Sequence, residues 1–219
     1  MSASADADVE QLRWMRRRVA EDAAAALAAR GFPTRIAGDQ GEALRAVLEQ
    51  IPEGATVGFG GSMTLEAIGA VDAVRSGPYR IIDRYRTGSW DETMEAYKRA
   101  LGADIFLTGV NAITKTGELL CVDSSGNRAA AMIFGPSRVI VVAGVNKVVE
   151  DLAAAFARLR RIAPLNCRRL GHKTPCAELG VCVDCMIPER MCNYTAIIHD
   201  GLKEKERIRV VLVTEELGF

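Results

Sequence analysis

Apolar residues recur every third or fourth position in the first part of the chain, and short apolar runs follow. Residues 9–30 and 40–50 have the helical spacing, which predicts two amphipathic helices. We expect the first to end at Gly31 and the second at Pro52, because glycine and proline commonly follow the last helical turn. A short strand is predicted between them, at residues 34–36.

This alternation of strand and helix patterns continues along the chain. Strands are predicted at 55–59, 79–83, 103–108, 139–143, 194–199 and 208–214, and helices at 64–74, 91–101, 129–132 and 148–162, the last ending at Pro164. Two extended pieces around Thr116-Gly117 predict a hairpin. Interleaved strands and helices indicate an α/β fold with a mostly parallel sheet flanked by helices. We expect residues 1–219 to form a single domain.

Residues 164–193 differ from the rest because they are rich in Cys, Pro and Gly and lack a clear period. Four cysteines lie there at the spacing C-x5-C-x2-C-x6-C, namely Cys176, Cys182, Cys185 and Cys192. A loop of this length is usually functional or held by something other than a core, and ligation of one metal centre would hold it. Thiolates select zinc or an iron–sulfur cluster, such as a [4Fe–4S] cluster. Free thiols or a redox disulfide are the alternatives.

Composition limits the partners. Hydrophobic residues make up 49% and charged residues 26%, as in ordinary globular proteins. Lys+Arg and Asp+Glu both total 28, so no basic surplus would attract nucleic acid or an anionic membrane. We see no apolar run of about 18 residues that would span a membrane, and no secretory signal. These features indicate a cytoplasmic protein, where clustered cysteines are more often ligands than disulfides.

A glycine-rich turn is the first candidate binding site. It joins the strand at 55–59 to the next helix, and its candidate ligand-binding residues are Gly58, Gly60, Gly61, Ser62 and Thr64. Glycines bring backbone N–H groups close to an anion, and a helix start adds partial positive charge. The spacing of a dinucleotide fingerprint and the P-loop lysine are both lacking. A plain strand-to-helix turn is the alternative.

Polar residues scattered among apolar ones between 111 and 128 form the second candidate. They are Asn111, Thr114, Glu118, Asp123, Asn127 and Arg128. Such side chains face a cleft or pair with one another, because buried polar groups need partners. Glu118 is the candidate catalytic base or nucleophile, with a solvated carboxylate as the alternative. Arg128 is a candidate fork for a carboxylate ligand, with a salt bridge to Asp123 or Glu118 as the alternative.

Three stretches together resemble the lactate-utilisation (LUD) domain family, from about Arg13 onward: GFGGSMTLEAIG, GVNAITKTGELLCVDSSGNRAAAMIFGPSRVIVVAGVNKVV and TPCAELGVCVDCMIPERMCN. The resemblance implies a fold similar to the ribose-5-phosphate isomerase, glucosamine-6-phosphate deaminase and CoA-transferase group. In that group a turn like this one contacts phosphate or CoA. The resemblance further implies that Asp83 and the segment from Asn111 to Thr116 approach the same cleft.

The resemblance implies a component of a lactate or 2-hydroxyacid oxidation system that binds a small anionic metabolite, alongside iron–sulfur partner subunits. The chain has no C-x2-C-x2-C-x3-C module, so direct multi-cluster electron transfer is not indicated. One alternative is an enzyme acting on a phosphorylated sugar or CoA ester, as members of the fold group do. Another is a noncatalytic assembly or electron-relay subunit. A homo-oligomer is left open.

Overall fold

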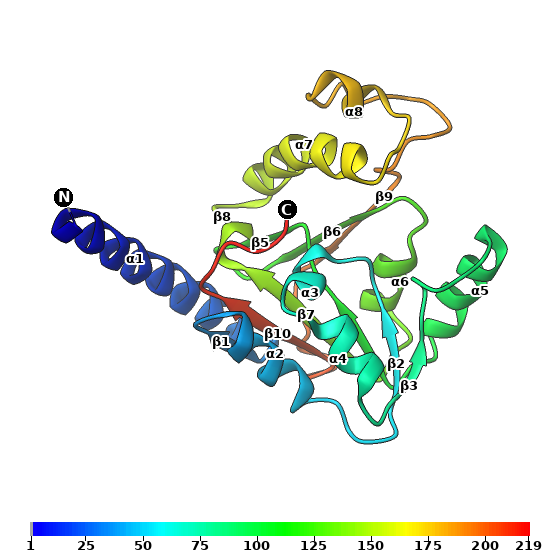
Figure 1. Ribbon diagram of the computed structural model, residues 1–219, viewed down its shortest axis with the longest axis horizontal. Helices are drawn as coiled ribbons and strands as arrows, with labels where there is room; N and C mark the ends of the chain where they lie inside the picture. The colour runs from blue at the N-terminus through cyan, green and yellow to red at the C-terminus, as the bar shows by residue number, and fades with distance from the viewer. Residues whose placement is uncertain (1) are drawn as a thin grey trace.

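A six-stranded parallel sheet forms the centre of the protein (Figure 1). The computed structural model describes the backbone of residues 2–219 and the side chains of residues 8–219. The strands are, in spatial order, β1 (Thr34–Ala37), β10 (Ile208–Val213), β7 (Arg138–Gly144), β4 (Ile105–Thr108), β2 (Thr56–Phe59) and β3 (Arg80–Ile82). All neighbouring pairs are parallel, which confirms the predicted fold class.

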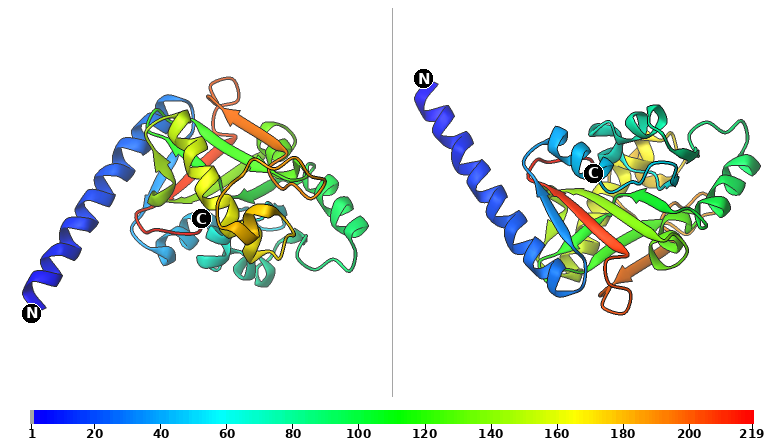
Figure 2. Two further views of the ribbon diagram at one scale, coloured as in Figure 1. Left: turned by 90° about the horizontal axis from the view of Figure 1, so that it is seen from above. Right: turned by 90° about the horizontal axis from the view of Figure 1, so that it is seen from below.

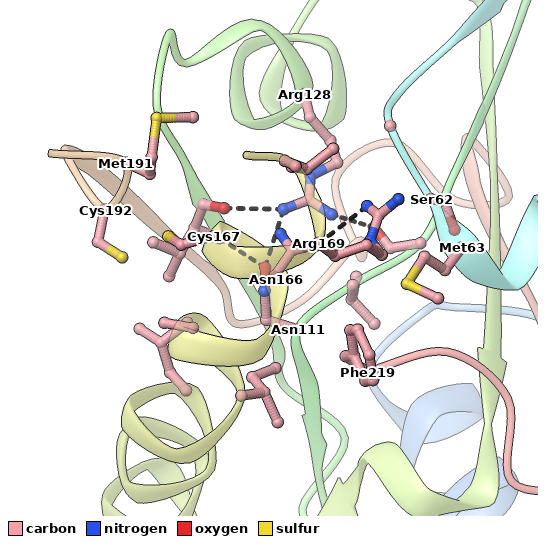
Figure 3. Close-up of a pocket in the computed structure, with 18 of the residues that line it drawn as sticks. Ser62, Met63, Asn111, Arg128, Asn166, Cys167, Arg169, Met191, Cys192 and Phe219 are labelled. Carbon is pink, nitrogen blue, oxygen red and sulfur yellow. Dashed lines mark hydrogen bonds between the residues drawn. The ribbon is translucent and has the colours of Figure 1, made fainter. Parts of the chain in front are cut away.

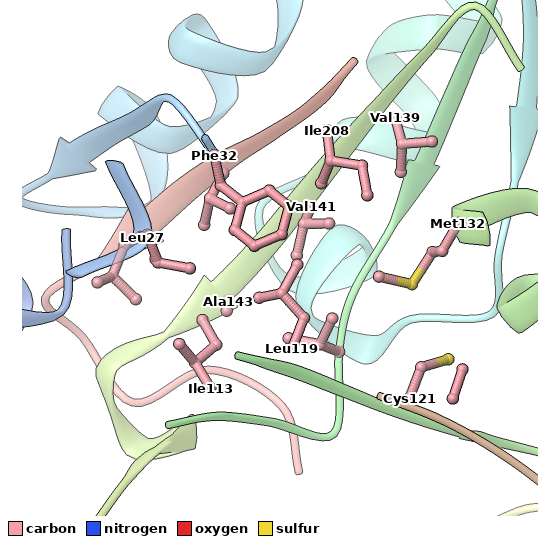
Figure 4. Packing of buried hydrophobic residues seen from close by; sticks show 14 of the residues in the cluster. Leu27, Phe32, Ile113, Leu119, Cys121, Met132, Val139, Val141, Ala143 and Ile208 are labelled. Carbon is pink, nitrogen blue, oxygen red and sulfur yellow. The ribbon is translucent and has the colours of Figure 1, made fainter. Parts of the chain in front are cut away.

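Both faces of this sheet are buried. Along β7, Val141 and Ala143 face one hydrophobic cluster, whereas Ile140 and Val142 face the other. Successive strand residues point to opposite faces, so a strand covered on both sides is apolar throughout. The first cluster, shown in Figure 4, is closed by α1 (Ser2–Ala29), α5 (Trp90–Ala100), α6 (Asn127–Ile133) and a second sheet. The second is closed by α2 (Gln40–Leu48), α3 (Met63–Ala67) and α4 (Ala70–Ser76).

The second sheet has four strands in the order β8 (Val148–Val149), β5 (Ala112–Thr114), β6 (Leu119–Asp123) and β9 (Tyr194–Ile198). β5 and β6 form the predicted antiparallel hairpin, whose turn contains Gly117 at a φ of 88°. The last two strands of the chain belong to different sheets. β9 pairs with β6 in the second sheet, and β10 lies between β1 and β7 in the parallel sheet.

Two predicted helices differ from the structure. The helix expected at residues 64–74 is two short helices, α3 and α4, because Gly69 between them has a φ of 71°. The helix expected from 148 begins instead at Leu152, because residues 148 and 149 form the strand β8, which follows a 3-10 turn, η1 (Val145–Lys147).

The prediction that Pro164 ends a helix is wrong. The helix α7 (Leu152–Arg169) continues through it. A proline inside a helix removes one backbone hydrogen bond. Burial of Pro164 and of its neighbours Ile162, Ala163 and Cys167 favours the helix despite that loss. The cysteine-rich segment therefore begins on a helix and includes a second one, α8 (Pro175–Leu179), which lies beside α7 in two views (Figures 1 and 2). Within residues 2–219, no helix has the length and apolar character needed to cross a membrane.

Candidate functional site

A cavity of about 430 Å³ lies where the parallel strands end (Figure 3). One wall comes from residues that follow β2, β3, β4 and β7: Gly61, Ser62, Arg84, Tyr85, Gly109, Asn111 and Lys147. The other wall is α7 and the cysteine-rich segment, with Leu159, Ile162, Ala163, Asn166, Cys167, Met191 and Cys192. We call this cavity the carboxyl-end pocket. Ligands of open α/β sheets commonly bind at this edge.

Two glycines of the predicted turn allow arginines to approach the backbone closely. A Cβ atom on Gly61 would lie 2.6 Å from Nη1 of Arg84, and one on Gly60 would lie 2.7 Å from Oγ1 of Thr108 and 3.1 Å from Cδ of Arg128. A side chain at Gly60 would crowd Thr108 and the aliphatic part of Arg128, whereas at Gly61 the tip of the Arg84 side chain would have to move. The turn therefore lets the side chains of Arg84 and Arg128 approach its backbone closely, besides joining the strand to the helix. Ser62 caps α3, where its hydroxyl accepts a hydrogen bond from the Leu65 N–H at 3.3 Å.

Arg128 is held by protein groups on three sides. Its Nε donates to Oδ1 of Asp123 at 2.9 Å, and its Nη2 donates to Oδ1 of Asn111 at 2.9 Å and to the Val122 carbonyl at 2.8 Å. Its Nη1 donates only a long bond of 3.4 Å to the Gly109 carbonyl. The sequence left open whether Arg128 binds a carboxylate ligand or forms a salt bridge to Asp123 or Glu118, and the salt bridge to Asp123 is present. Arg128 therefore offers a ligand in the pocket its positive charge and the N–H groups of Nη1.

Lys147 was not predicted as a site residue, but it lines the pocket and is 4% exposed. Its Nζ donates to Oγ1 of Thr64 at 2.9 Å, and Thr64 in turn donates to the Leu217 carbonyl at 3.3 Å. Burial, together with the nearby cations Arg158 and Arg128, lowers the pKa of Lys147 to about 7. The available signal in the sequence was a lysine in the apolar run VVAGVNKVV, where a charged residue is unusual.

Cations outnumber carboxylates around the carboxyl-end pocket. Its lining includes Arg84, Arg128, Lys147 and Arg169, but among the side chains described only one carboxylate, that of Glu66. Arg84 stacks its guanidinium on the rings of Tyr85 and Tyr97, with centroids 5.3 Å and 4.9 Å away. Its Nε atom is buried and, within residues 8–219, has no hydrogen-bond partner. The pocket is therefore suited to an anion.

Glu118, Thr114 and Thr116 lie elsewhere, at the turn end of the β5–β6 hairpin, and are not among the residues lining the pocket. Glu118 accepts hydrogen bonds from both threonines at 3.1 Å, and its Oε1 lies 2.9 Å from Nδ1 of His199. Burial raises the pKa of Glu118, but the hydrogen bonds from His199 and the threonines outweigh burial and lower it. A carboxylate stabilised in this way is a weaker base, and its contacts are those of a structural group.

Three further predicted residues do not line the pocket either. Gly58 allows α5 to pack against β2, because a Cβ there would lie 2.9 Å from Cβ of Ala100. Asp83 accepts hydrogen bonds from Nε and Nη2 of Arg75 at 2.9 Å and 3.3 Å. Asn127 is the first residue of α6. Of the predicted ligand-binding residues, the pocket is thus lined by Gly61, Ser62, Asn111 and Arg128, with Gly60, Thr64 and Asp123 in contact with lining residues.

Three of the four predicted cysteine ligands act electrostatically on the fourth: burial raises the pKa of Cys192, Arg190 lowers it, and the thiols of Cys182, Cys176 and Cys185 raise it. Cys167 on α7, which was not among the predicted ligands, has a pKa raised to about 11, first by burial and then by Cys176 and Cys192, with the Thr174 hydroxyl acting in the opposite direction.

Cys167 and Cys192 reach the pocket wall, across from Ser62 and Met63 in Figure 3. Within residues 2–219, no three or more Cys, His, Asp or Glu side chains are arranged as ligands of a metal ion. The metal centre therefore stays a prediction.

Comparison with known proteins places this site in a family. The chain is similar to a crystal structure of a DUF162 family protein from Deinococcus radiodurans, with a TM-score of 0.52 and 12% identity over 90% of this chain and 97% of that one. At this identity the likeness shows the fold alone. No curated protein matches the sequence. The family model for the LUD domain matches residues 20–213, which include the parallel sheet, all of the pocket lining except Phe219, and the cysteines, and the chain therefore belongs to the LUD domain family.

Proposed function

We propose that the carboxyl-end pocket binds a small carboxylate, a 2-hydroxy or 2-oxo acid, as part of a lactate-utilisation system. The observation that carries this proposal is the excess of cations around the pocket, where the arginines Arg84, Arg128 and Arg169 are opposed by Glu66. Membership of the LUD domain family supports a role related to lactate utilisation. The class of ligand, a lactate-like acid, is the one implied by the resemblance of the sequence to the same family.

One wall of the pocket would bind the carboxylate of such a ligand, and the other wall would contact its alkyl group. Arg84 has an Nε without a hydrogen-bond partner among residues 8–219, and a guanidinium binds a carboxylate through paired N–H donors. The opposite wall contributes Leu159, Ile162 and Ala163, which would contact an alkyl group. A carboxylate near Arg84 would thus leave the rest of the molecule between the apolar wall and Lys147.

Loss of Arg84 should weaken binding of L-lactate and pyruvate by about thirtyfold, equivalent to about 2 kcal/mol, because a charge-assisted hydrogen-bond pair is removed. Isothermal titration calorimetry of Arg84→Met tests this. Arg86→Met is the matched control, since Arg86 lies in the same loop, is largely exposed and does not line the pocket. Equal affinities for wild type and Arg84→Met would contradict the proposal. Binding of inorganic phosphate without either acid would favour the alternative of a phosphorylated substrate.

We further propose that the cysteine-rich segment holds an iron–sulfur cluster or zinc. The donor set supports this, because thiolates are the ligands that both prefer, and Cys176, Cys182 and Cys185 act electrostatically on Cys192. Cys176, Cys182, Cys185 and Cys192 are the proposed ligands. A cluster would supply electron transfer beside the pocket, whereas zinc would stabilise the loop.

Metal analysis distinguishes these forms. Protein purified without oxygen should contain either iron with acid-labile sulfide and a visible absorption band, or zinc without one. Cys185→Ser should lose most of the metal. Cys121→Ser is the control and should keep it, because Cys121 is fully buried in the main core, where burial raises its pKa to about 12. Wild-type protein without bound metal, or equal metal content in both variants, would contradict the proposed centre.

A further inference from the structure

Lys147 differs from an ordinary buried lysine in that no carboxylate accompanies it. Among the described side chains, residues 8–219, no Asp or Glu lies within salt-bridge distance of its Nζ, and its hydrogen-bond partner is the Thr64 hydroxyl. Buried ammonium groups are otherwise paired, because an uncompensated charge in a protein interior is strongly unfavourable. The residue nevertheless lines the carboxyl-end pocket rather than a closed core.

The surroundings of Lys147 favour its neutral form. Burial, together with the cations Arg158 on α7 and Arg128 on α6, lowers the pKa to about 7. A substantial fraction of the side chain is then an uncharged amine at neutral pH. Lysines made neutral by burial and by neighbouring cations are the ones that act as nucleophiles toward carbonyl groups.

The hydrogen bonds of Thr64 leave the lone pair of the amine free. Thr64 donates its only hydroxyl hydrogen to the Leu217 carbonyl, so it accepts an N–H from Lys147 and has no hydrogen to donate to it. A neutral amine that donates to Thr64 keeps its lone pair for another partner. The pocket is the space from which a ligand would reach Nζ.

We propose that Lys147 forms an imine with the keto group of a 2-oxo acid bound in the carboxyl-end pocket. The inference rests on the proposed function for the ligand class and adds a covalent step to it. The Nζ lone pair attacks the keto carbon, a C–N bond forms, and the keto oxygen leaves as water after proton transfers. The step consumes no oxidant or reductant. A carboxylate at Arg84 would hold the ligand while its keto group faces Lys147.

Reduction with borohydride traps such an imine as a stable secondary amine. Wild-type protein incubated with pyruvate and then reduced should gain the mass of one pyruvic acid less one oxygen atom, and peptide mapping should locate the gain on Lys147. Lys147→Met should show no adduct beyond the background on surface lysines. Lys115→Met is the matched control and should be modified like wild type, since Lys115 is exposed and pairs with Glu150.

Two further measurements separate a specific imine from random modification. L-Lactate has no keto group, so it should form no adduct, and it should compete with pyruvate for the pocket. Adduct formation should increase with pH through a midpoint near 7, where Lys147 loses its proton. Surface lysines remain protonated in this range and should not show that midpoint.

The possible failures are distinguishable. If calorimetry shows that pyruvate binds but reduction gives no adduct on Lys147, the imine is overturned and the proposed pocket function stands. If pyruvate does not bind and gives no adduct, both are overturned. Mapping on wild-type protein decides the question even if Lys147→Met fails to fold.

Discussion

Replacing Arg128 with methionine should lower the free energy of unfolding by about 3–5 kcal/mol, the range expected when one partner of a buried ion pair is removed. The side chains of Arg128 and Asp123 are 13% and 7% exposed and are joined by a bond of 2.9 Å. Without Arg128, the Asp123 carboxylate would keep its hydrogen bond from the Ala129 N–H but lose its counter-charge. The Asn111 side chain and the Val122 carbonyl would also lose a donor. Urea unfolding followed by circular dichroism measures the change.

Arg209→Met is the control for removing an arginine. Its ion pair with Glu206 joins residues three apart, and the Glu206 side chain is largely exposed. Exposed pairs contribute little, so this variant should differ from wild type by less than about 1 kcal/mol. A change as small for Arg128→Met would show that Asp123 is solvated rather than buried with its partner. Arg128→Lys should recover only part of the loss, because lysine cannot donate to all three neighbours.

The parallel sheet was predictable because its signal is local. Strands such as β7 and β10 are buried on both faces and therefore read as continuous apolar runs. The order of the strands was not predictable, since it depends on packing between distant segments. The separation of β9 from β10 illustrates this, because each sequence pattern alone is compatible with either sheet.

The candidate site was predicted in part for the same reason. The glycine turn is local, and its flanking strand and helix gave its position. Glu118 does not line the carboxyl-end pocket, because Asn111 and Glu118 lie at different ends of the β5–β6 hairpin. Cys167 lies outside the C-x5-C-x2-C-x6-C run and was not predicted as part of it, yet α7 continues through Pro164 to Cys167, where Cys176 acts on its pKa. Lys147 required knowledge of burial that a single sequence does not give.

Replacing Lys147 with methionine should stabilise the protein at neutral pH. The pKa of Lys147 falls from 10.5 to about 7 on folding, so below pH 10.5 the unfolded chain binds a proton more readily than the folded one. This difference opposes folding by at most about 5 kcal/mol, and the opposition is complete below pH 7. Methionine has a similar length and carries no charge, so it removes this term. Loss of the hydrogen bond to Thr64 would offset about 1 kcal/mol of the gain.

The pH dependence identifies the cause of that stabilisation. In wild type, deprotonation of Lys147 should raise the free energy of unfolding by about 1 kcal/mol between pH 7 and pH 8. Thiols of the unfolded chain lose part of their protons in this range and act in the opposite direction, but they do so equally in wild type and both variants, so the difference between the proteins reports Lys147. Lys147→Met should lack the increase. Lys98→Met should retain it, because Lys98 is exposed and forms only a long, exposed ion pair with Glu95 at 3.8 Å. Unfolding curves at both pH values measure the difference. An equal increase in wild type and Lys147→Met would mean that Lys147 stays charged in the folded protein, and a neutral amine in the pocket would then be excluded.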